Sequence, residues 1–183
     1  MCIESILQNH FGVKKVTFEK SDVIRDCESA FGEDCTVCES LTPSGKEAFA
    51  KLIGLLEDIE CVFVEGHSTD PWAEQLKEIA SKRWNIYDNV DIEANIPRFR
   101  NTSLDSIIQA HFGIKRVFLK TPKIYGYLLR GEPEPQYEYF TRAGGRAYGQ
   151  LTELIYDLGE LFGSDFHSNR IIDLMDSVSI RGH

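Results

Sequence analysis

The chain has 183 residues, of which 42% are hydrophobic and 27% charged, and its formal net charge at pH 7 is −9. This composition is typical of a globular protein and excludes a disordered chain, and its length allows a core to form without disulfides or metals. Because the charge is acidic and the basic residues come at most in pairs, nucleic acid and anionic membranes are disfavoured as partners. An acidic surface suits a basic protein partner, but in most acidic proteins it serves only solubility. No apolar run approaches the ~20 residues that cross a bilayer, and the first residues lack the features of a signal peptide. We therefore expect a cytoplasmic protein, or a periplasmic one if a targeting segment has been removed.

A duplicated motif opens each half of the chain. Residues 5–16 and 106–117 are identical at eight of twelve positions, with a constant offset of 101. Such identity at a fixed spacing indicates an internal repeat. In each copy, apolar residues at helical spacing predict a short helix, and alternating residues after it predict a strand. Between them stands Gly12 or Gly113, where a helix end favours a left-handed residue.

All five cysteines lie within the first 61 residues. An odd number without a secretory signal is typical of reduced thiols in a cytosol. Cys27, Cys35 and Cys38 could offer three thiolates to zinc, with His67 as a fourth ligand, and the Cys-x-x-Cys pair could serve redox chemistry. A single such pair is a weak signal, so we expect plain reduced cysteines and no bound metal.

The next segment predicts a long helix followed by a strand. Thr42 precedes a proline, a pairing that favours a helix start, and residues 49–56 continue with an apolar stripe at helical spacing. Residues 61–64, Cys-Val-Phe-Val, predict a short buried strand. A further helix is expected from Asp70 to Tyr87.

Residues 41–70 resemble the peptidoglycan-binding domain shared by OmpA and the flagellar stator protein MotB. This chain and the family share a Leu-Thr-Pro-x-Gly helix start and an apolar helix. In the family, a strand that closes on Gly-His-Thr-Asp follows. Here that motif reads Gly66-His67-Ser68-Thr69-Asp70, with one serine inserted. The resemblance implies that Asp70, with Arg83 in the following helix, binds the diaminopimelate of a bacterial cell wall. An anion beside a cation suits such a zwitterion.

The second copy repeats this order, with Thr141 as the helix cap, an apolar stripe after it and a strand at residues 178–180. Its extra residues, around 162–175, predict an added helix. Alternating helices and strands predict an α/β (α+β) fold of two internally duplicated αβαβ-like units, with a mixed sheet and helices packed on one face. Residues 1–100 would form the first repeat unit and residues 101–183 the second, as two small domains or one pseudo-symmetric domain.

The acidic segment 131–140 differs from the rest of the second copy. Its prolines stiffen the chain, and its tyrosines can serve as rigid contact groups. A solvated loop is the alternative interpretation. The residues predicted to contact a partner are Glu132, Glu134, Tyr137, Glu138 and Tyr139.

No Ser-His-Asp set, phosphate-binding glycine loop or His-x-x-x-His pair occurs in the sequence. His10 and His111 are expected to cap helix ends, so we assign no catalytic residue and no cofactor. These patterns favour a non-enzymatic protein-binding module, in its most concrete form an acidic inhibitor or immunity-type protein that masks a basic partner. Peptidoglycan binding in the manner of OmpA and MotB is the alternative, and an enzyme with an unrecognised site is a third hypothesis.

Overall fold

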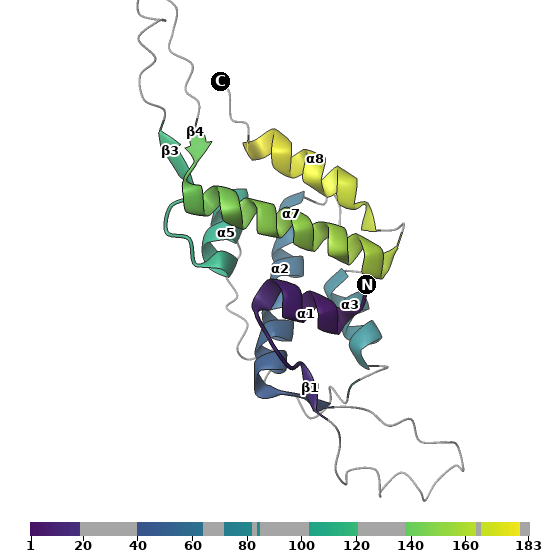
Figure 1. Ribbon diagram of the computed structural model, residues 1–183. Helices are drawn as coiled ribbons and strands as arrows, with labels where there is room; N and C mark the ends of the chain where they lie inside the picture. The colour runs from purple at the N-terminus through teal and green to yellow at the C-terminus, as the bar shows by residue number, and fades with distance from the viewer. Residues whose placement is uncertain are drawn as a thin grey trace, which may run out of the picture. The chain divides into compact units, whose positions relative to one another are not determined.

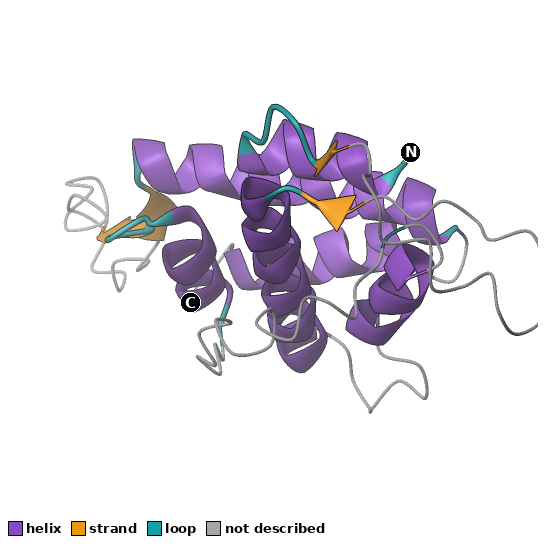
Figure 2. Cartoon of the chain, turned by 90° about the horizontal axis from the view of Figure 1, so that it is seen from below, coloured by secondary structure: helices purple, strands orange, loops and turns teal. Residues whose placement is uncertain are grey.

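The computed structural model of the protein describes residues 1–18, 40–63, 72–81, 84, 103–120, 138–163 and 166–179 (Figure 1). Helix is the main secondary structure of these residues (Figure 2). The elements, in chain order, are α1 (Ile3–Phe11), β1 (Thr17–Phe18), β2 (Ser40–Leu41), α2 (Pro43–Phe63), α3 (Trp72–Ser81), α5 (Leu104–Phe112), β3 (Phe118–Lys120), β4 (Glu138–Phe140), α7 (Arg142–Phe162) and α8 (Ser168–Ser179).

The expected mixed sheet is wrong for the described residues. Their strands form only two separate antiparallel pairs, β1 with β2 and β3 with β4, and no strand is longer than three residues. Two such short pairs cannot carry a layer of helices, so buried helix faces supply the core instead. The described part of the chain is therefore mainly helical, with the helix order of the predicted repeat but without its sheet.

The chain divides into two compact units. Unit 1 comprises Met1–Glu57 with Ser68–Arg98, and unit 2 comprises Asp58–His67 with Phe99–His183. The boundary falls inside α2, so the last residues of this helix belong to unit 2.

In unit 1 the loop after α1 meets the start of α2. Gly12 ends α1 with φ 68° and ψ 20°, the left-handed conformation predicted from the sequence. The Thr42 hydroxyl donates to the Lys15 carbonyl at 2.8 Å and accepts from the Gly45 amide at 3.0 Å. Thr42 thus caps α2 as expected and also fixes the α1 loop against it.

Gly45 shows how close this approach is. A Cβ atom at this position would lie 2.4 Å from the Val16 carbonyl oxygen. Only a residue without a side chain allows the first turn of α2 to pack so closely on the chain before β1.

Unit 2 repeats this junction. Gly113 ends α5 with φ 67° and ψ 24°. The Thr141 hydroxyl donates to the Arg116 carbonyl at 2.8 Å and accepts from the Gly144 amide at 2.9 Å. A Cβ atom on Gly144 would lie 2.5 Å from the Val117 carbonyl oxygen. The helix, glycine and short strand predicted for both copies are therefore present in each unit with the same backbone contacts.

The strand predicted at residues 61–64 is also wrong, because α2 continues through Phe63. Ile59 and Phe63 are buried, and they extend the helical spacing of the preceding buried stripe. Cys61, between them, is exposed, as a helix face requires but a fully buried strand does not. The apolar residues 61–63 are therefore the end of a helix and not a strand.

Helix α8 takes the place of the second predicted strand. It begins within the segment 162–175, where an added helix was expected, but it extends through Ser179. Ile171, Ile172 and Met175 are buried at helical spacing, whereas Val178 is an exposed helical residue and Ile180 lies outside the described residues. Helix α3 lies within the range predicted after Asp70.

No helix among the described residues is both long enough and apolar enough to cross a membrane.

Candidate functional site

The base of the β3–β4 hairpin in unit 2 holds the described part of the predicted partner-binding segment. Phe118 is paired with Phe140 in the antiparallel register, and their rings stack with centroids 4.8 Å apart. The Thr141 amide, next along the chain, donates to the Val117 carbonyl at 2.6 Å. The two strands are therefore joined both through their rings and through the backbone that starts α7.

The aromatic contacts continue onto the helices. The Phe140 ring lies 5.0 Å from that of Tyr148 on α7, and the Tyr148 hydroxyl donates to an Asp176 carboxylate oxygen on α8. Helices α7 and α8 also pack along each other (Figure 1). These contacts form a continuous connection from the hairpin base to two helices, so the hairpin base is held in one position.

Tyr139 projects from this base. Successive residues of a strand point to opposite faces, so Tyr139 lies on the face opposite the stacked Phe140 ring. Tyr139 is 56% exposed, the largest exposed fraction among the large hydrophobic residues of the described chain. Glu138 is in strand β4, opposite Lys120 in the register. The other predicted contact residues, Glu132, Glu134 and Tyr137, lie outside the described residues.

A second arrangement with possible chemistry joins two helices of unit 2. The Asp58 Oδ2 atom lies 2.6 Å from Nε2 of His111, in the last turn of α5. Because a carboxylate only accepts hydrogen bonds, Nε2 carries the proton that is donated. The side chains are only 12% and 17% exposed, for Asp58 and His111 respectively, which leaves little of this pair open to a substrate. We interpret it as a structural link between α2 and α5.

His10 and His111 both stand in the last turn of their helices, as the capping hypothesis requires. The Asp58 partner of His111 was not predicted. A signal for it does exist in the sequence, because Asp58 and Asp157 are repeat equivalents at an offset of 99, in the register that also relates Thr42 to Thr141. The close packing of Gly45 and Gly144 also has a signal in the repeat, since Thr-x-x-Gly occurs at the same place in both copies.

The remaining predicted sites fall on parts of the chain that the structure does not describe. Asp70 and Arg83, the residues implied by the cell-wall resemblance, lie outside the described residues, as do Cys27, Cys35, Cys38 and His67. Cys2 and Cys61 are exposed free thiols. No group of three or more potential metal ligands occurs within the part of the chain that the structure describes.

Comparisons with protein-family models, with curated proteins and with solved structures give no match for this chain.

Proposed function

We propose that the protein is a non-enzymatic protein-binding module that contacts its partner through the hairpin base, with Tyr139 as the central contact. The observation that carries this proposal is the exposure of Tyr139 on a base that the Phe118–Phe140 stack holds in place. Tyrosine is enriched among the residues that dominate binding energy, because it offers a large contact area with few rotatable bonds. Because the stacked rings hold the strand on which Tyr139 lies, less backbone entropy is lost on binding.

The charge of the chain indicates the kind of partner. At −9, the protein attracts a basic protein over long range and accelerates the encounter with it. Glu132, Glu134 and Glu138 lie in the sequence immediately before Tyr139 and would add carboxylates to the same contact. An inhibitor or immunity-type protein that masks a basic partner is the most concrete form of this function.

A quantitative pull-down tests this proposal with a matched pair of variants. Tyr139→Ala removes the exposed ring at the hairpin base, whereas Tyr156→Ala removes a ring on α7 that is 48% exposed. A basic partner from a lysate of the source organism should remain bound to the wild-type protein and to Tyr156→Ala, and should be depleted at least tenfold, about 1.4 kcal/mol, by Tyr139→Ala. Equal recovery with all three proteins would contradict the assignment of Tyr139.

Peptidoglycan binding through Asp70 and Arg83 is the alternative proposal. It rests on the sequence resemblance of residues 41–70 alone, and residues 61–63, where the resemblance implies a strand, continue helix α2. This alternative requires the purified protein to sediment with isolated cell-wall sacculi and requires Asp70→Ala to prevent it. Sedimentation that Tyr139→Ala does not change would favour the wall over a protein partner.

A further inference from the structure

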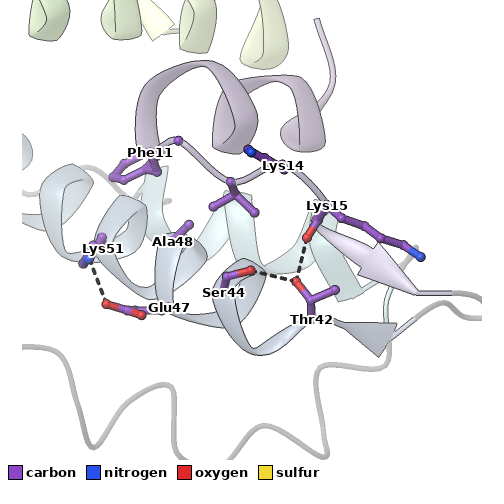
Figure 3. Close-up of a pocket in the computed structure, with 10 residues that line it drawn as sticks. Phe11, Lys14, Lys15, Thr42, Ser44, Glu47, Ala48 and Lys51 are labelled. Atoms are coloured by element: carbon purple, nitrogen blue, oxygen red, sulfur yellow. Dashed lines mark hydrogen bonds and ion pairs between the residues drawn. The ribbon is translucent and has the colours of Figure 1, made fainter.

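A cavity of about 510 Å³ lies in unit 1, between the loop after α1 and the first turns of α2 (Figure 3). Its volume is within the range of small-molecule sites, roughly 300–1,000 Å³. Phe11, Val13 and Ala48 supply an apolar part of its wall. The cavity is remote in sequence from the proposed partner surface and needs a separate explanation.

The charged side chains of the wall are mostly cationic. Lys14, Lys15 and Lys51 line the cavity, and Glu47 is its single carboxylate. Figure 3 shows Lys51 paired with Glu47 on one side, while the Lys15 side chain extends away from that pair on the strand side. A net positive lining is unexpected in a chain with a net charge of −9.

The pair of Lys51 and Glu47 does not close the cavity. The Lys51 Nζ atom lies 2.9 Å from Glu47 Oε1, but the two side chains are 55% and 70% exposed. Exposed pairs of this kind contribute little, on the order of 0–1 kcal/mol. An anionic ligand can therefore compete with Glu47 for the Lys51 ammonium group.

The internal repeat supplies an independent observation. Lys14 and Lys15 correspond to Lys115 and Arg116 in unit 2, and all four are exposed. Packing explains the repetition of buried positions such as Val16 and Val117. In the second copy, Arg116 also has a structural contact, because its Nε atom donates to the Phe118 carbonyl at 3.2 Å. The counterpart of Glu47 is Arg146, so the second copy is even more basic here. The repeat therefore places two positive charges at the same loop in both copies, whereas Lys51 corresponds to Gln150 and belongs to the unit 1 site alone.

We propose that the unit 1 cavity binds a small molecule that carries a phosphate monoester, with the phosphate near Lys14 and Lys51 and an apolar body against Phe11 and Val13. Lysine ammonium groups bind phosphate as compact point charges, and several of them together suit a dianion better than a monoanion. The proposed site does not use the Gly45 amide at the start of α2 as an anion donor, because this amide already donates to the Thr42 hydroxyl. A nucleic acid is disfavoured because each additional phosphate is repelled by the acidic chain.

Isothermal titration calorimetry of the full chain with phenyl phosphate tests the site. We expect saturable binding that is tighter for phenyl phosphate than for inorganic phosphate, because only the former reaches the apolar wall, and no binding of phenol. The double variant Lys14→Gln/Lys51→Gln should weaken phenyl phosphate binding at least tenfold. Glu47→Gln should tighten it roughly threefold, because it removes the competing carboxylate. Arg170→Gln, which removes an exposed charge from α8, is the matched control and should leave the affinity unchanged.

Circular dichroism and thermal melting establish that each variant is folded, and all the substituted residues are exposed, so folding should persist. Absence of saturable binding to the wild-type protein would overturn the proposal. So would an equal loss in Arg170→Gln, which would indicate non-specific charge attraction. Tighter binding of a single-stranded DNA oligonucleotide, lost in the same double variant, would overturn the small-molecule assignment. None of these outcomes depends on Tyr139, so this site and the proposed partner surface are tested separately.

Discussion

Asp58 and His111 are 53 positions apart in the sequence, yet their side chains meet at 2.6 Å across α2 and α5. Both are largely buried, so each would lose hydrogen-bonding capacity without the other. The contact connects the last residues of a helix of the first copy to the repeated helix of the second copy.

A double-mutant cycle with Asp58→Ala and His111→Ala measures this contact. We expect each single substitution to lower the free energy of unfolding, and the coupling energy to be about 0.5–3 kcal/mol, because the two side chains are in direct contact. The measurement is urea denaturation followed by circular dichroism. Asp173→Ala, at an exposed position of α8, is the control and should change stability by no more than about 0.5 kcal/mol. A coupling energy of zero would show that the pair does not stabilise the fold.

Two glycines of α7 should respond in opposite directions to the same substitution. Gly144→Ala places a Cβ atom 2.5 Å from the Val117 carbonyl oxygen, so the helix start must move away, at a cost of about 1–3 kcal/mol. Gly149→Ala has no atom within 4 Å of the new Cβ and should stabilise the helix by about 0.5–1 kcal/mol. Melting temperatures of the two variants provide the comparison. Equal shifts for both would mean that α7 does not approach Val117 as closely as described.

The glycine at the end of α1 is constrained by its backbone and not by its neighbours. Gly12 has φ 68°, and a Cβ atom there would meet nothing within 4 Å. Gly12→Ala should therefore cost about 1–2 kcal/mol through backbone strain alone, and Gly12→Asn should cost less, because asparagine tolerates the left-handed region. Chemical denaturation distinguishes them. An alanine variant as stable as the asparagine variant would contradict the strain explanation.

Local signals predicted the ends of α1 and α5 and the starts of α2 and α7, whereas the mixed sheet predicted from the order of the elements was wrong. Gly12 and Gly113 restrict backbone handedness, and Thr42 and Thr141 satisfy helix amides, so each acts within a few residues of its own position. The prediction of a strand at residues 61–64 was wrong because local sequence does not decide between strand and helix there. A run of four apolar residues fits a buried strand and a helix end equally well, and only the burial of Ile59 and Phe63 on one side of α2 decides between them.

The candidate sites also divide into those that local sequence predicts and those that depend on tertiary packing. The exposure of Tyr139 follows from a local strand alternation that the sequence contains. The Asp58–His111 contact and the lysine-lined cavity instead depend on which segments pack together, which a single sequence without a matching relative does not determine. Their traces in the sequence are visible only when the two copies are compared position by position.

The placement of the unit boundary inside α2 has a genetic consequence. A shortened gene that encodes only residues 99–183 would contain the whole second copy, but its product would lack residues 58–67, which belong to unit 2. His111 would then be synthesised without Asp58. Recombination at the junction between the copies would therefore release a second copy that lacks one of its own buried contacts. A deletion that keeps the end of α2 would preserve this contact, so the two ways of reversing the duplication differ in their cost to stability.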